Sequence, residues 1–178
     1  MAEFHQGDAM ALPFPADRFD AAVMALVLVF VPEPAKGVAE MVRVVRPGGT
    51  VAAYMWDMTG GGFPLDPIAV EMRAMGLTPP RPPQIDASRR EAMQDLWTGA
   101  GIEAVETREI AVQRTFADFD DFWTIALKSP SMGPAIKAMA SADVERLRSG
   151  VRARLSADAD GRITHSARAN AIKGRLPE

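Results

Sequence analysis

Residues 19–56 read FDAAVMALVLVFVPEPAKGVAEMVRVVRPGGTVAAYMW, and the architecture follows from this stretch. The run from Phe19 to Val31 is almost continuously apolar and rich in valine. It lacks the alternation of a half-exposed strand, which is typical of a strand buried on both faces of a parallel sheet. Pro32 and Pro34 follow it, and proline cannot donate to a strand ladder. The stretch therefore predicts a buried strand over residues 19–31.

The next part of the same stretch predicts a helix and a second strand. Apolar residues recur at the helical spacing i, i+3, i+4 and i+7, namely at Val38, Met41, Val42 and Val45. Pro47-Gly48-Gly49 ends this pattern, and an apolar run resumes from Thr50 to Trp56. A strand, a helix and a strand within about forty residues form a βαβ unit. The two strands are therefore expected to be parallel, with a right-handed crossover.

The remaining sequence extends this pattern. Ser88 and Glu91 have the spacing of a capping box at the start of a helix, and Asp118 precedes another helical stripe of apolar residues. The expected elements are a short strand over residues 2–6, helices near 88–100, 118–129 and 141–155, and strands at 104–116 and 162–175. The last of these strands is expected at an edge. The predicted fold class is α/β, a mostly parallel sheet with flanking helices and an antiparallel last strand.

Composition excludes several classes of protein. The 178 residues are 48% hydrophobic and 24% charged with a formal net charge of −3, which is typical of a globular domain and not of a disordered or fibrous chain. There are no cysteines, so disulfide scaffolds, cysteine-ligated metal sites and thiol nucleophiles are excluded. A reducing cytoplasmic location fits this composition.

Nothing in the sequence indicates a membrane span. The longest apolar run, from Ala21 to Val31, is about half of the ~20 residues that a transmembrane helix needs. Acidic Asp8, Asp17 and Asp20 precede it where a signal peptide would carry positive charge.

Ligands of open α/β sheets bind beyond the carboxyl ends of the strands. The positions to consider are therefore 7–10, 24–28 and 56–57, and Asp8 is placed to accept hydrogen bonds from an amine or a hydroxyl. By itself the Gly7-Asp8 pair is a weak signal and is more often a plain turn.

Two motifs carry a resemblance to a known family. Asp8-Ala9-Met10-Ala11-Leu12-Pro13-Phe14, at its spacing from Arg46-Pro47-Gly48-Gly49, resembles class I S-adenosylmethionine-dependent methyltransferases. The group it resembles is methyltransferase type 11, which includes enzymes of ubiquinone and menaquinone biosynthesis. The resemblance covers Phe4 to about Asp57 and implies a Rossmann-like sheet.

The resemblance also implies a cofactor site and a substrate side. S-adenosylmethionine is the implied cofactor and a small molecule the implied methyl acceptor. Asp8 would bind the adenine amino group, Ala9 would offer its backbone N–H to the ring, and Ala25 would contact the methionine part through its backbone. The implied cofactor-binding positions are Asp8, Ala9, Met10 and Ala25, and the implied substrate-binding positions are Trp56 and Asp57. The resemblance implies no fixed catalytic residue, because methyl transfer depends mainly on proximity and orientation.

The sequence also departs from this family. The family begins with a strand followed by a glycine-rich cofactor loop, and here the glycine-rich stretch is Gly60-Gly61-Gly62, after a different strand. We therefore expect an N-terminally truncated, incomplete methyltransferase sheet. We also expect one partial domain over 1–178, with a cofactor-side core at 1–57, a substrate-side insertion at 58–88 and a C-terminal α/β part at 89–178. The strand at 19–31 would then have an unpaired edge.

Two functions remain open at this point. One is methyl transfer to a small molecule, impaired in this chain alone because the glycine-rich loop is absent. The other is a non-catalytic, methyltransferase-derived module for dimerisation or interaction, with two copies pairing through the exposed strand edge.

Other features carry less information. A lone histidine on a strand, such as His165, is more often structural than catalytic. No metal-ligand pattern is present. Residues 146–175 hold eight Arg or Lys side chains and two Asp, a net charge of +6, whereas residues 1–145 have a net charge of −8. The acidic remainder and the lack of interleaved aromatic residues disfavour nucleic-acid binding.

Overall fold

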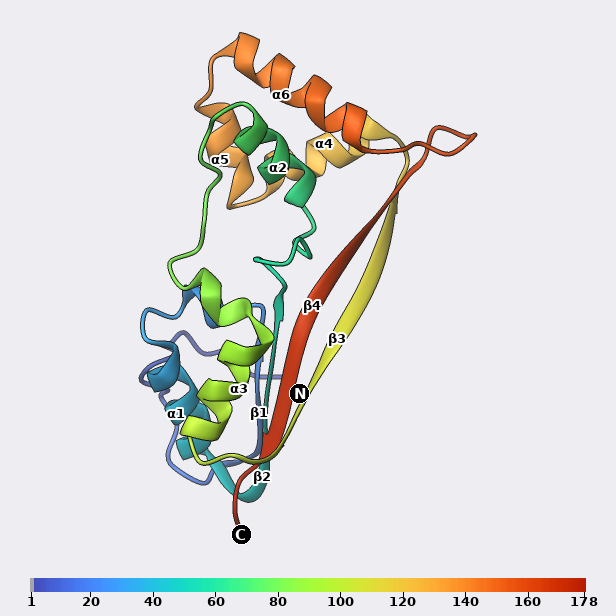
Figure 1. Cartoon of the computed structure of the whole chain (residues 1–178). Coiled ribbons are helices and arrows are strands. Elements are labelled where there is room, and N and C mark those ends of the chain that lie inside the picture. The colour runs from blue at the N-terminus through green and yellow to red at the C-terminus, as the bar shows by residue number, and fades with distance from the viewer. Residues whose placement is uncertain (1) are drawn as a thin grey trace. The chain divides into compact units, whose positions relative to one another are not determined.

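The computed structural model describes residues 2–178 (Figure 1). Within them the strands are β1 (Phe19–Ala25), β2 (Val45–Trp56), β3 (Glu103–Phe116) and β4 (Ile163–Arg175). The α-helices are α1 (Pro34–Val44), α2 (Asp66–Ala74), α3 (Arg90–Gly99), α4 (Phe119–Lys128), α5 (Met132–Lys137) and α6 (Ser141–Arg154). Two short 3₁₀ helices are η1 (Leu28–Phe30) and η2 (Ile85–Ser88).

The strands form a sheet in the order β1-β2-β4-β3. β1 is parallel to β2, and β4 is antiparallel to β2. The predicted α/β class with an antiparallel last strand is confirmed. β1 lies at the edge of the sheet, as expected for a strand with an unpaired edge, but it is not buried on both faces, because Val23 is 63% exposed.

The predicted βαβ unit is confirmed as β1, α1 and β2. Pro34 begins α1, where its missing N–H costs nothing, and Val38, Met41 and Val44 are buried on one face of this helix. The Pro-Gly-Gly segment lies inside β2, because the register moves from Phe19–Val45 to Ala21–Thr50. Residues 46–49 therefore form a bulge in β2.

The bulge in β2 holds the C-terminal tail. Gly48 has a φ of 70°, and its N–H donates to the carbonyl of Pro177 at 3.0 Å. The N–H of Leu176 donates to the carbonyl of Gly49 at 2.9 Å. The bulge thus gives hydrogen-bond partners to the chain end that follows β4.

Two predicted strands differ from the structure. Residues 2–6 form neither a helix nor a strand. The predicted strand at 19–31 ends as β1 at Ala25, and Leu26 then takes a left-handed conformation with φ 58°. The apolar run continues as η1, which buries Leu28 and Val29 in the core. Periodicity alone cannot distinguish a buried strand from a buried turn in so short an apolar run.

Two further expectations were wrong. β4 is not an edge strand, because it lies between β2 and β3. Ser88 does not cap α3: its hydroxyl donates to the carbonyl of Ile85 at 2.7 Å, and the buried side chain of Asn170 in β4 donates to the carbonyl of Ser88 at 2.9 Å. A buried polar group binds the nearest unpaired partner, and tertiary packing supplied one here.

The chain folds as two compact units. Unit 1 contains residues 1–60, 82–110 and 169–178, and unit 2 contains residues 61–81 and 111–168. β3 and β4 each contribute residues to both units. A single domain built from the ranges 1–57, 58–88 and 89–178 stays a prediction.

Unit 1 has its core on one face of the sheet. Figure 1 shows α1 and α3 on the same side of β1 and β2. The core includes Met24 of β1, Val51 of β2 and the fully buried Trp97 of α3. The indole N–H of Trp97 donates to the carbonyl of Val51 at 3.1 Å, so the largest buried side chain of this core is also hydrogen-bonded.

Unit 2 has a separate aromatic core. The helical stripe that begins at Phe119 is buried, with Phe122 fully enclosed, and it packs with Leu147 and Val151 of α6. Asp118 caps α4, since its carboxylate accepts the N–H of Asp121 at 2.8 Å. Among residues 2–178, no helix combines the length and the apolar character that crossing a membrane requires.

Candidate functional site

The carboxyl ends of β1 and β2 meet at one edge of unit 1. Ala25, the last residue of β1, is paired with Tyr54, and the N–H of Leu26 donates to the carbonyl of Tyr54 at 2.9 Å. Trp56 ends β2 two residues later and is half-buried. The structure therefore brings Ala25 and Trp56 to the same edge, as parallel pairing requires.

Asp57 follows directly and organises a turn. One of its carboxylate oxygens, Oδ1, accepts the backbone N–H of Gly60 at 2.9 Å. A Cβ at residue 60 would overlap the Asp57 carboxylate, so a larger residue would require the Asp57 side chain to move. The predicted substrate-side carboxylate thus has a structural role in the segment that leaves β2.

Asp8, Ala9 and Met10 lie in a loop of unit 1 that precedes β1. Asp8 Oδ1 accepts the N–H of Met10 at 2.8 Å, and the Asp8 carbonyl accepts the N–H of Ala11 at 3.0 Å. Ala9 and Met10 are half-buried against the core. Within residues 2–178, the other carboxylate oxygen of Asp8 and the N–H of Ala9 have no hydrogen-bond partner, so this turn presents one acceptor and one donor.

A salt bridge on α1 fixes this loop. Glu40 Oε2 accepts the N–H of Leu12 at 2.7 Å, and Arg43 donates to the carbonyls of Phe14 at 2.8 Å and Leu12 at 3.1 Å. Arg43 Nε also donates to Glu40 Oε1 at 2.7 Å. The Arg43 hydrogen bond is the largest cause that lowers the pKa of Glu40 from 4.5 to about 2. The carboxylate therefore stays ionised and holds the loop at neutral pH.

The sequence analysis did not identify the Glu40–Arg43 pair or its contacts with the loop. Glu40 and Arg43 stand three residues apart on one helix, a spacing at which opposite charges are neighbours. That spacing would have predicted the ion pair between them. The contacts with Leu12 and Phe14 span about thirty residues and have no signal in the local sequence.

All six predicted positions belong to unit 1. Ala25, Trp56 and Asp57 come from the ends of adjacent strands, whereas Asp8, Ala9 and Met10 come from a separate loop on the same core. Among residues 2–178, no three His, Cys, Asp or Glu side chains gather in the way that a metal site requires.

His165 carries a buried polar atom of unit 2 that lacks a partner among residues 2–178. Its Nε2 is buried without a hydrogen bond among residues 2–178, and its ring meets the edge of Phe122 with centroids 6.4 Å apart. Burial lowers the pKa of His165, and the nearby Asp66 carboxylate partly opposes this effect. The imidazole is therefore held in its neutral form near pH 7.

The basic residues of α6 are largely paired within unit 2. Asp120 accepts from Arg148 at 2.7 Å and from Arg152 at 3.2 Å, and Glu71 accepts from Arg154 at 2.7 Å. Arg152 also lies over the ring of Phe119, 4.6 Å from its centroid. These side chains cover the helical core and satisfy local carboxylates.

The first third of the chain matches a known family. Residues 1–53 match the family model described as a methyltransferase domain. A demethylmenaquinone methyltransferase of Desulfitobacterium hafniense is 51% identical over 62 residues, which are 34% of this chain and 24% of that protein. An uncharacterised protein of Mycobacterium tuberculosis is 38% identical over 58 residues, or 33% of this chain and 21% of that protein. The match thus spans about a fifth to a quarter of the length of these relatives.

Solved structures match the chain over nearly its whole length. A proposed methyltransferase from Bacillus halodurans has a TM-score of 0.54 and 18% identity, covering 97% of this chain and 71% of that one. At this identity the likeness concerns the fold. The chain shares its fold with this solved structure, and its first 53 residues match the methyltransferase domain model.

Proposed function

We propose that this chain binds S-adenosylmethionine in unit 1 and takes part in methyl transfer to a small-molecule acceptor. The observation that carries the proposal is the Asp8–Ala9 turn, which presents an unpaired carboxylate oxygen beside an unpaired backbone N–H. This turn lies in the segment that matches the family. The Glu40–Arg43 pair fixes the loop that follows it.

The turn has the chemistry that an adenine ring requires. The exocyclic amine of adenine is a donor, and the adjacent ring nitrogen is an acceptor. Asp8 supplies the acceptor and Ala9 the donor, so both groups on this edge of the base would be satisfied by two neighbouring residues. Met10 would support the turn, since its N–H is already bound to Asp8 and its side chain packs on the core.

The remaining predicted positions would serve the reacting end of the cofactor. Ala25 has no polar side chain, so it would act through its backbone at the end of β1, close to where β2 ends at Trp56. When bound, the cofactor supplies a methyl group from a sulfonium to a nucleophilic atom. The role of this chain's residues would be to hold the two reactants in line.

Trp56 and Asp57 are proposed to face the acceptor. The half-buried indole of Trp56 offers apolar surface, and Asp57 holds the turn that leads into the Gly60–Gly62 segment. The relative from Desulfitobacterium hafniense is named for a small-molecule quinone acceptor, which supports a small-molecule class. Its match covers 34% of this chain and 24% of that protein, so the acceptor's identity does not follow from it.

We further propose that binding by this chain alone is weak. A glycine-rich loop brings backbone N–H groups close to a ligand, and here the glycine triplet follows β2 rather than preceding β1. The Asp8–Ala9 turn would then supply much of the contact between this chain and the cofactor.

Calorimetry with S-adenosylhomocysteine tests this proposal. Saturable binding by the wild-type chain is expected, and Asp8→Asn should weaken it by roughly tenfold or more, because the amide nitrogen cannot accept from the adenine amine. Asp86→Asn, an exposed carboxylate on η2, is the matched control and should bind as the wild type does. Absence of binding in the wild-type chain, or equal affinity in both variants, would contradict the proposal.

The alternative function is an interaction module that pairs through the β1 edge. Val23 of β1 is 63% exposed, Val27 and Phe30 beyond the end of β1 are 41% and 57% exposed, and no charged residue interrupts the run from Ala21 to Val31. Unprotected edges of this kind pair with other strands, and natural proteins usually block them with charge. A second copy could add its β1 to this edge.

Sedimentation analysis separates the two functions. If the alternative function is correct, the chain is a dimer and Val23→Lys converts it to a monomer. Val112→Lys, at an exposed valine of β3, should leave the dimer intact. A stable dimer without S-adenosylhomocysteine binding would contradict the methyl-transfer proposal. Binding by a monomer would contradict the alternative.

A further inference from the structure

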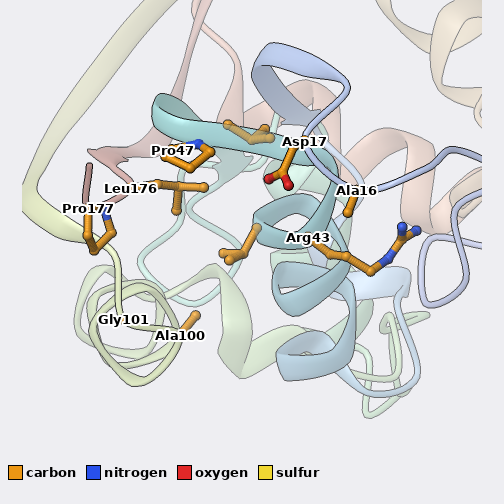
Figure 2. A pocket seen from close by; sticks show the side chains of 10 residues that line it. Ala16, Asp17, Arg43, Pro47, Ala100, Gly101, Leu176 and Pro177 are labelled. Carbon is orange, nitrogen blue, oxygen red and sulfur yellow. The ribbon is translucent and has the colours of Figure 1, made fainter.

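A pocket of about 490 Å³ opens in unit 1 at the amino ends of β1 and β2 (Figure 2). Its walls come from the segment before β1, the end of α1, the bulge of β2, the end of α3 and the C-terminal tail. The lining residues used below are Asp17, Arg43, Pro47, Ala100, Leu176 and Pro177. Ala25 and Trp56 lie at the opposite, carboxyl ends of the same two strands. The pocket therefore lies at the other end of these strands from Ala25 and Trp56, and its lining does not include Asp8, Ala9 or Met10.

The walls of the pocket are mainly apolar. Pro47, Leu176 and Pro177 meet where the C-terminal tail binds the bulge of β2. In Figure 2 the carboxylate of Asp17 points toward the side formed by Pro47 and Leu176, and the guanidinium of Arg43 points away from them. The pocket thus combines apolar surface with a carboxylate.

The carboxylate of Asp17 is not neutralised by the protein. Among residues 2–178 its side chain has no ion pair or hydrogen bond, and only its backbone N–H is bound, to the carbonyl of Arg43 at 3.1 Å. The Arg43 guanidinium is already used by Glu40 and by the carbonyls of Leu12 and Phe14. The charge that faces the pocket is therefore negative and available.

The backbone at Asp17 supports a role for this side chain. Its φ of 56° lies in the left-handed region, which Asp and Asn adopt more often than other residues with a side chain. Such conformations recur at functional sites, where the surrounding structure holds a side chain in a required direction. Here the conformation directs the carboxylate toward Pro47 and Leu176.

We propose that this pocket binds a small organic cation. The ammonium group would pair with Asp17, and the apolar body would pack against Pro47, Leu176 and Pro177. The volume lies within the range of roughly 300–1,000 Å³ that is usual for small-molecule sites. The unpaired carboxylate of Asp17 favours a cation over an anion or a neutral molecule of the same shape.

Titration of the full chain by NMR with benzylamine, and with benzyl alcohol as its neutral counterpart, tests the proposal. Benzylamine should bind saturably and shift the amides around Leu176 and Ala100, and benzyl alcohol should bind more weakly. Asp17→Asn should weaken the binding of benzylamine by about two- to fivefold, the range of an exposed ion pair, and should leave the affinity for benzyl alcohol unchanged. Asparagine also tolerates the left-handed backbone, so the turn is preserved.

Two controls complete the test. Asp86→Asn removes an exposed carboxylate outside the pocket and should leave benzylamine binding unchanged. Ala100→Phe places a ring in the pocket and should abolish binding, with circular dichroism used to verify that the variant is folded. Equal benzylamine affinity in the wild type and Asp17→Asn, or shifts confined to other parts of the chain, would overturn the proposal.

Discussion

Single residues of this chain join segments that are far apart in the sequence. Trp97 fills the core of unit 1 and donates to β2, and Asn170 donates to the carbonyl of Ser88 across more than eighty residues. Neither contact has a local signal. The residues of the candidate site were identified from local motifs, whereas the contacts that hold Asp8's loop come from α1 and were not.

The Glu40–Arg43 pair predicts an acid-sensitive loop. The folded pKa of Glu40, about 2, lies below its ordinary 4.5, so its stabilising effect is complete above about pH 4.5 and is lost as the pH falls toward 2. The Leu12 amide resonance should therefore titrate in this window. In Glu40→Gln the titration should disappear, and in Glu33→Gln, which alters an exposed pair with Lys36, it should remain.

His165 predicts a second acid-sensitive response, in unit 2 and at higher pH. Because burial lowers its folded pKa below the ordinary 6.5, the unfolded chain binds the proton more readily. Stability is complete above about pH 6.5 and decreases as the pH falls below it. The protection factors of the α4 amides against hydrogen exchange should fall in that window in the wild type and in His5→Gln. In His165→Leu they should no longer fall, and a fall that persists in that variant would contradict the assignment.

At the scale of elements, apolar runs and turn residues indicated most helices and strands, while their ends depended on tertiary contacts. α4 begins after its predicted cap at Asp118, because that cap is a local hydrogen bond. β1 is shorter than its apolar run, because Leu28 and Val29 are buried by η1 instead of by the sheet. β4 was misplaced at an edge, since its neighbour β3 comes from a distant part of the chain.

The bulge of β2 predicts a contrast between two glycines. A Cβ at Gly49 would lie 2.8 Å from the carbonyl oxygens of Arg46 and Asp20, so Gly49→Ala should destabilise unit 1 by about 1–3 kcal/mol. Gly99, at the end of α3, has no atom within 4 Å of an added Cβ. Gly99→Ala should be neutral or stabilising by up to ~1 kcal/mol. Thermal denaturation followed by circular dichroism compares the stabilities of the two variants. An equal loss of stability in both would contradict this account of the bulge.

For the whole molecule, the two units have separate cores. Leu147 is fully buried in the core of unit 2, and Leu147→Ala should cost about 2–5 kcal/mol there. Hydrogen exchange measured by mass spectrometry should accelerate in α2 and α6 and stay unchanged in α1 and β2. Equal acceleration in both units would show that they unfold as one, contrary to this expectation.

The sequence by itself determined the α/β class, the βαβ unit, the methyltransferase motifs and the apolar β1 that lies at the edge. These features depend on residues close together in the chain. Their spacing follows from the periods of helices and strands and from which face of each element is buried. Only the tertiary structure decided that β4 lies inside the sheet and that Glu40 and Arg43 fix the Asp8 loop. It also decided that Asp17 faces a pocket beside the C-terminal tail. Those outcomes depend on contacts between distant segments, where many partners satisfy the same local pattern and packing selects one.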